Sequence, residues 1–198
     1  MAISGSHDNE KYLSVPVVRH FSNRIIWVVI LAFIGLISGF VLHRFEDTLS
    51  SLVLLALYMP MLMDTGGNTG SQAATIVIRS LAIGDIKGKD LLQVLWKELR
   101  VSLMISLVIG VLAFARVLFL SRNAVIPPEF TLFSIAGAIA VALSLQVISA
   151  TMIGAALPLI VTKAKMDPAV VASPDITTVV DITGLIIYFT TATLMLGL

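Results

Sequence analysis

A dense run of polar residues interrupts one of the most apolar parts of this chain. Residues 63–72 read MDTGGNTGSQ, with apolar residues on both sides. A second acid, Asp181, lies in the last apolar stretch of the chain. A carboxylate at the centre of a membrane helix costs about 2.5–3.5 kcal/mol, so we expect both acids to face a polar interior and not lipid.

Asp64 and Asp181 are the only carboxylates placed well inside the apolar stretches, and no lysine or arginine lies at comparable depth. The threonines beside Asp181 (Thr177, Thr178 and Thr183) add oxygen atoms only. Such a set suits a hard cation such as Mg²⁺, Ca²⁺ or Na⁺ better than zinc or copper. Because Mg²⁺ dehydrates reluctantly, a few acids among weaker oxygen ligands could hold the hydrated ion loosely enough to release it again.

These residues by themselves are compatible with three functions. The first is passive conduction of a divalent cation. The second is a proton- or sodium-coupled carrier, because a buried aspartate such as Asp64 can titrate. The third is a non-transporting membrane subunit in which the polar residues and glycines only pack helices together.

Composition places the chain in a membrane. It has 198 residues, of which 58% are hydrophobic and 13% charged, and a mean hydropathy of +1.00, values typical of integral membrane proteins. The net charge of +1 gives no electrostatic footprint for nucleic acid. Without cysteine and with three histidines, the chain offers no thiol nucleophile and no convincing zinc site, and we find no arrangement typical of an enzyme.

The apolar stretches predict an all-α membrane protein with five transmembrane helices per chain, each long enough to cross a bilayer. The expected spans are residues 24–42, 50–83, 101–120, 130–161 and 176–198. Residues 91–100 are amphipathic and are expected to form an interfacial helix before the third span. The predicted organisation is thus residues 1–20, a disordered N-terminus with a tag-like start and an approach segment, followed by a membrane domain over residues 21–198.

Small and polar residues inside the spans suggest helix packing. Gly35 and Gly39 form a small-residue face that we expect to pack against another helix. The fourth span carries four polar residues that we expect to bond between helices more than to line a pore: Ser144, Gln146, Ser149 and Thr151.

Lysine and arginine are distributed unevenly between the two sides of the predicted topology. With the N-terminus inside, the outer side carries only Arg44, Arg116 and Arg122. The positive-inside rule therefore places the N-terminus in the cytoplasm and the C-terminus outside the plasma membrane. Five helices with two acids make a thin pore wall, so we also expect a twofold homodimer that brings a second Asp181 across the axis.

Several segments resemble the hallmark motifs of the MgtE family of magnesium channels, in that family's order and spacing. They are PMLMDTGGNTGSQ at residues 60–72, RxLAxGD at 79–85, DPA at 167–169 and DITGLIIYF at 181–189. The resemblance extends from about residue 20 to the end of the chain. It implies a dimeric five-helix domain whose Mg²⁺ pore is built largely from the second and fifth helices.

The resemblance also implies roles for particular residues. Asp181 matches the central pore acid that holds hydrated Mg²⁺, and Thr177 matches a position whose backbone carbonyl joins that site. The remaining expected pore-lining residues are Asp64, Gly67, Asn68, Gln72, Ser173, Thr178 and Gly184. Ser173 departs from relatives that carry asparagine before the proline, which weakens the match at that mouth. Since about 20 residues precede the first span, we expect the soluble magnesium sensor of the family to be missing.

Overall fold

A computed structural model describes residues 15–165 and 173–198, and the described part is helical without strands. The predicted disorder of the first residues and the DPA motif at 167–169 lie outside the described residues. The helices in chain order are α1 (Val17–Arg44), α2 (Glu46–Ser51), α3 (Leu54–Ala82), η2 (Gly88–Asp90), α4 (Leu91–Leu120), α5 (Leu132–Lys163) and α6 (Ser173–Leu196).

Local sequence accounts for several helix ends. Thr131 precedes α5, and its hydroxyl accepts a hydrogen bond from the Ser134 backbone N–H in a capping box. Asp90 accepts a bond from the Lys87 backbone N–H where η2 leads into α4. After α3 ends, Gly84 adopts a φ of 77°, a left-handed conformation that glycine tolerates best.

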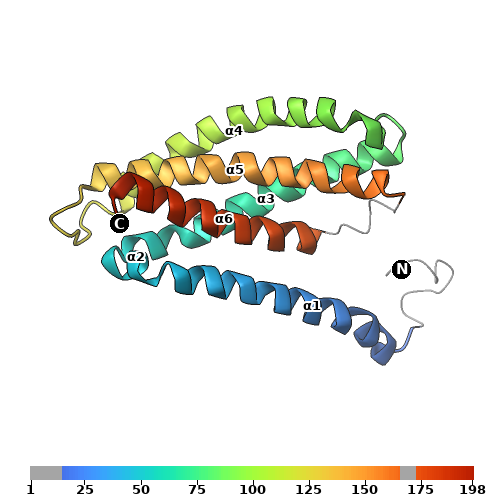
Figure 1. Cartoon of the computed structure of the whole chain (residues 1–198), viewed down its shortest axis with the longest axis horizontal. Helices are drawn as coiled ribbons and strands as arrows, with labels where there is room; N and C mark the ends of the chain where they lie inside the picture. Colours follow the sequence, from blue (N-terminus) through green and yellow to red (C-terminus); the bar gives the residue numbers. More distant parts are fainter. Residues whose placement is uncertain (1–14, 166–172) are drawn as a thin grey trace.

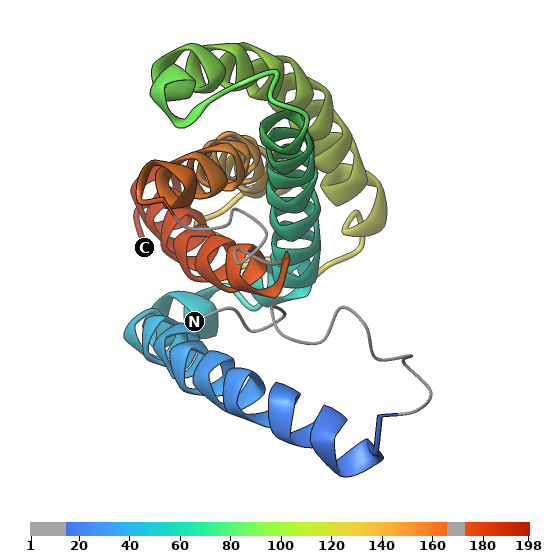
Figure 2. The same ribbon diagram turned by 90° about the vertical axis from the view of Figure 1, so that its right-hand side faces the viewer.

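α5 lies at the centre of the bundle and packs against α3, α4 and α6 (Figures 1 and 2). α3 and α6 also contact each other, whereas α1 packs mainly on α6 and stands at the edge of the bundle. α5 carries many small residues on its buried side, and alanines such as Ala136, Ala138 and Ala142 let neighbouring helices approach.

The largest apolar cluster lies at the end of the bundle where α3 begins and α6 ends, and two buried tyrosines bond across it. The Tyr188 hydroxyl donates a 2.8 Å hydrogen bond to the Leu55 carbonyl, which ties α6 to α3. The hydroxyls of Tyr58 and Ser121 are 2.7 Å apart and join α3 to the end of α4. Both tyrosines therefore keep their polar ends satisfied inside an apolar core.

Four helical segments among the described residues are long and apolar enough to cross a membrane: α1, residues 88–120 (η2 with α4), α5 and the 176–196 part of α6. The second predicted span, in α3, is not one of them. Its 29 residues have the length, but the polar run from Asp64 to Gln72 lowers its hydropathy. The fifth crossing therefore stays a prediction.

α1 begins at Val17, so the helix already includes residues 17–20. The structure corrects two other expectations. Residues 91–100 form no interfacial helix of their own, because they continue without a break into the rest of α4. Gly35 and Gly39 have no neighbouring atom within 4 Å of an added Cβ, so they do not face another helix of the described chain.

Candidate cation site

The polar run of the sequence is regular helix. α3 continues through Pro60 and all three glycines of the run from Leu54 to Ala82. Asp64 consequently does not cap a break in the backbone. In a helix, residues three and four apart share a face, so Asp64, Gly67, Asn68 and Ser71 lie on one side of α3.

This face of α3 and the facing side of α6 enclose a hollow of about 350 Å³. Its α6 side carries Thr177 and Asp181, one helical turn apart. Its α3 side carries Met63, Asp64, Gly67, Asn68 and Ser71. Two acids that are 117 positions apart in the sequence thus line one hollow, together with an amide and two hydroxyl side chains.

Hydrogen bonds and packing fix the shape of the hollow. The Asn68 amide nitrogen donates to a carboxylate oxygen of Asp64 at 3.2 Å, which orients both side chains. Gly67 is buried against Thr177, whose methyl carbon would lie 3.3 Å from a Cβ atom at position 67. α3 and α6 therefore approach closely at the glycine, while the longer polar side chains border the open space beside it.

The charge of the hollow favours cations. Its lining contains two carboxylates and no arginine or lysine. Across the described part of the chain, no three histidine, cysteine, aspartate or glutamate side chains gather as a metal-binding group. A site with two acids and several neutral oxygens cannot form an all-carboxylate cage, so it fits a cation that keeps much of its water shell.

Three of the predicted site residues do not line this hollow. Gln72 is exposed elsewhere on α3, and Thr178 follows Thr177 about 100° further around α6. Gly184 is buried against the Gln146 side chain on α5. The Ser173 side chain lies outside the described residues.

Two lining residues, Met63 and Ser71, were missing from the predicted site. Helical spacing alone indicates that Ser71 shares the face of Gly67 and Asn68, because it follows them by four and three positions. The expectation of bonds between helices holds for Ser144 and Gln146. The Ser144 hydroxyl donates to the Ser106 carbonyl on α4 at 3.1 Å, and the Gln146 amide donates to the Val180 carbonyl on α6 at 2.9 Å.

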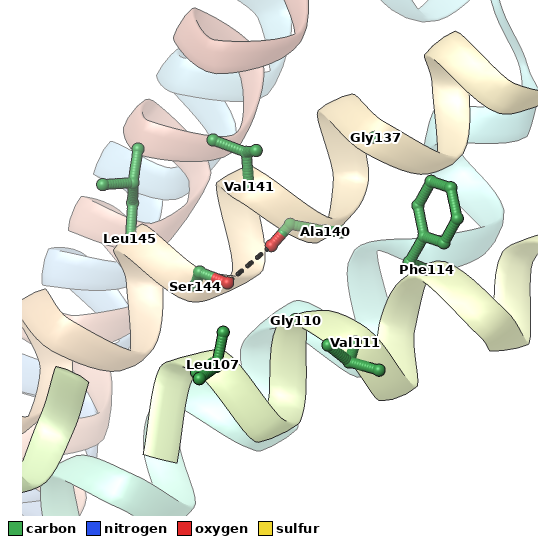
Figure 3. Close-up of a pocket in the computed structure, with 9 residues that line it drawn as sticks. All are labelled: Leu107, Gly110, Val111, Phe114, Gly137, Ala140, Val141, Ser144 and Leu145. Carbon is green, nitrogen blue, oxygen red and sulfur yellow. Dashed lines mark hydrogen bonds between the residues drawn. The ribbon is translucent and has the colours of Figure 1, made fainter. Parts of the chain in front are cut away.

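A second hollow is chemically unlike the first. It is an apolar groove of about 400 Å³ between α4 and α5, lined by residues such as Leu107, Val111 and Phe114 (Figure 3). Its one hydroxyl, on Ser144, shares its proton between the Ala140 carbonyl of its own helix, at 2.9 Å, and the Ser106 carbonyl on α4. With no acid in its lining, this groove is unsuited to a cation.

Comparison with known proteins agrees with the chemistry of the α3–α6 hollow. Residues 59–191 match the MgtE family, described as divalent cation transporters. The chain is similar to the magnesium transporter MgtE of Thermus thermophilus, with 36% identity over 173 residues, and to that of Bacillus subtilis, with 38% identity over 170 residues. The Enterococcus faecalis protein of the same name is 27% identical over 175 residues.

These alignments cover 87%, 86% and 88% of this chain, but only 36%, 36% and 37% of the three relatives. The chain thus spans about a third of the length of the curated relatives it matches. The matched segment begins just before Pro60 and ends beyond Asp181, so it contains both sides of the hollow. The chain belongs to the MgtE family of divalent cation transporters.

Proposed function

We propose that this chain forms the conducting part of a Mg²⁺-selective channel that admits hydrated magnesium to the cell through a pore shared by two copies. The pore is lined by α3 and α6, the second and fifth of the predicted spans. The observation that carries this proposal is the joint placement of Asp64 and Asp181 in one hollow with neutral oxygen ligands. The relatives named as magnesium transporters support Mg²⁺ as the cation.

The exposure of the site supports a second copy of the chain. Asp64 and Asn68 are exposed on the surface of the single chain, although both lie near the middle of α3. A carboxylate and an amide cannot face hydrocarbon without a large cost in free energy. A twofold axis beside α3 and α6 would instead turn both hollows toward one water-filled path and double the number of acids.

The proposed pore requires α3 to cross the membrane as well. Its 29 residues span about 44 Å at 1.5 Å per residue, enough for a bilayer. α3 lies along α5 and α6, which are themselves apolar enough to cross. With five crossings the positive-inside rule puts the N-terminus in the cytoplasm and the C-terminus outside, in the plasma membrane.

In this pore, Asp181 attracts the hydrated ion and the oxygens around Thr177, its backbone carbonyl included, hold the water shell. Asp64 and Asn68 face the same ion from α3. Binding through water is weak enough for the ion to leave, as conduction requires. The membrane potential drives entry, because each charge gains about 2.3 kcal/mol per 100 mV and a divalent ion gains twice that.

The test is Mg²⁺ uptake by vesicles that contain the purified chain and a Mg²⁺-sensitive dye. We expect uptake driven by a negative-inside potential, its loss in Asp181→Ala and Asp181→Asn, and normal uptake in Asp47→Asn, which neutralises an exposed acid of α2. Chemical crosslinking should recover a dimer from every variant.

Two results would overturn the proposal. Undiminished uptake by the Asp181 variants would show that the ion does not pass this hollow. Uptake that needs a proton or sodium gradient, with slow turnover, would replace the channel by a coupled carrier.

A further inference from the structure

Gln146 is a fully buried amide at the point where α3, α5 and α6 meet. Its side-chain nitrogen donates a 2.9 Å hydrogen bond to the carbonyl of Val180, the residue directly before Asp181. Its side-chain oxygen has no hydrogen-bond partner within the described residues. A buried polar side chain that leaves one end unsatisfied lowers stability, so packing alone does not account for it.

Two glycines make the room that Gln146 occupies. A Cβ atom at Gly66 on α3, or at Gly184 on α6, would collide with the amide nitrogen of Gln146. The amide thus fills the gap between the two helices from the α5 side. Gly66 directly precedes Gly67, and Val180 directly precedes Asp181, so the amide lies behind the hollow at the level of its acids.

The hydrogen bond also constrains the rotation of α6. Its acceptor belongs to Val180, whose side chain lies against Gly70 of α3, 3.2 Å from the position of an added Cβ atom. Successive residues of a helix are turned by about 100°, so fixing Val180 toward α5 and α3 directs Asp181 to the neighbouring side, into the hollow.

We propose that Gln146 is a positioning residue for the cation site. Its amide sets the separation of α3 and α6 and the rotation of α6, and through them the placement of Asp181 opposite Asp64 and Asn68. Gln146 itself does not line the hollow, so it acts on the ion only through these helices. The inference rests on the proposed function, because it names Gln146 as a residue that determines the ion affinity and selectivity of that site.

The chain provides a matched control on the same helix. Ser144 also lies on α5 and also donates to a backbone carbonyl of another helix, that of Ser106 at 3.1 Å, but this carbonyl belongs to α4. Removal of either bond should loosen the bundle. Only removal of the Gln146 bond should alter the cation site.

The first experiment compares Gln146→Leu and Ser144→Ala in the vesicle uptake assay. Leucine keeps much of the glutamine volume but cannot donate. We expect Gln146→Leu to raise the half-saturating Mg²⁺ concentration about tenfold and to lower the preference for Mg²⁺ over Ca²⁺. Ser144→Ala should leave both quantities within about twofold of the unmodified chain, whatever its melting temperature. Unchanged affinity and preference in Gln146→Leu, or equal shifts in both variants, would overturn the positioning role.

A second measurement does not depend on transport. The chain contains no cysteine, so spin labels can be attached at cysteines introduced for exposed Leu57 on α3 and Leu194 on α6. The doubly labelled chain is mixed with an excess of unlabelled chain, so that a dimer rarely carries labels on both copies. The measured distance then joins two labels within one copy. The distance distribution between the labels should shift or broaden in Gln146→Leu and stay the same in Ser144→Ala. An unchanged distance distribution in Gln146→Leu would refute the positioning role of Gln146, even if the chain moved no magnesium. Failed uptake by the unmodified chain together with a shifted distribution in Gln146→Leu would count against the proposed function alone.

Discussion

Gly154 on α5 lies directly against the backbone of Gly70 on α3, so closely that a Cβ atom at position 154 would overlap the Gly70 carbonyl oxygen. Two glycines at one crossing let helix backbones touch, which is the usual way that membrane helices pack closely. The contact occupies the α5 side of α3. The polar side chains of Asp64, Asn68 and Ser71 are therefore left for the opposite, solvent-accessible hollow.

This contact predicts that Gly154→Ala destabilises the bundle. The alanine methyl would meet backbone and not the end of a flexible side chain, so α3 or α5 must shift. We expect a loss of about 1–3 kcal/mol, the usual cost of overpacking. Thermal unfolding in detergent measures it. Gly137→Ala is the control on the same helix, since an added Cβ there meets no atom within 4 Å, and an equally unstable control would contradict the explanation.

Asp64→Asn tests whether the exposed acid of α3 attracts the ion. Asparagine keeps the shape of the side chain but removes one negative charge from the hollow. We expect the half-saturating Mg²⁺ concentration to rise about tenfold, the size of a charge interaction through water with a divalent ion. Asp85→Asn, which neutralises an exposed acid after α3, should behave like the unmodified chain. A variant that loses stability while its Mg²⁺ dependence is unchanged would favour a packing role for Asp64.

Tyr188→Phe removes a buried hydrogen bond about two helical turns from Asp181 along α6. The lost bond joins the Tyr188 hydroxyl to the Leu55 carbonyl at 2.8 Å, and its removal should cost about 1 kcal/mol of stability without altering ion affinity. Thermal unfolding and uptake are measured on the same preparation. Ser50→Ala removes an exposed bond to Glu46 within α2 and should change stability by less than about 0.5 kcal/mol. A change in Mg²⁺ affinity in Tyr188→Phe would show that this end of the bundle controls the site.

Much of the fold could be predicted from the sequence because lipid demands long apolar helices. The positions of α3, α5 and α6 follow from apolar stretches bounded by polar loops. The first span is predicted from residue 24, whereas α1 already begins at Val17 and includes Arg19, because a helix can extend beyond the apolar stretch that crosses the membrane. The amphipathic pattern of residues 91–100 indicated a surface helix, but a helix with that pattern can also continue straight into a membrane span.

Only part of the candidate site could be predicted from the sequence. Depth in an apolar stretch identified Asp64 and Asp181, and the motifs added Gly67, Asn68 and Thr177. Gly184 is another expected pore-lining residue, in the same motif as Asp181, yet it is buried against Gln146. Which side of α6 meets α5 depends on contacts between helices that are far apart in the sequence, and no local pattern specifies it.

Gly67 on α3 packs against Thr177 on α6 beside the hollow. In Gly67→Ala, the new methyl would lie 3.3 Å from the methyl carbon of Thr177, so the Thr177 side chain, or α6 with it, must move by a few tenths of an ångström. We expect Mg²⁺ uptake to fall severalfold because Thr177 and Asp181 move with α6. Thr177→Ser removes the methyl group that is in contact and keeps both the hydroxyl and the backbone carbonyl, so alone it should conduct almost normally.

The double variant Gly67→Ala with Thr177→Ser should recover most of the lost uptake, because serine leaves room for the alanine methyl. Uptake by all four chains gives the coupling between the two positions, which contacting residues show and distant ones do not. Gly35→Ala serves as the control, since an added Cβ there meets no atom within 4 Å. Strictly additive losses would mean that the two residues act independently and that their contact does not hold the cation site in shape. Recovery would instead support the expectation that position 177 serves the ion through its backbone and not through its side-chain methyl.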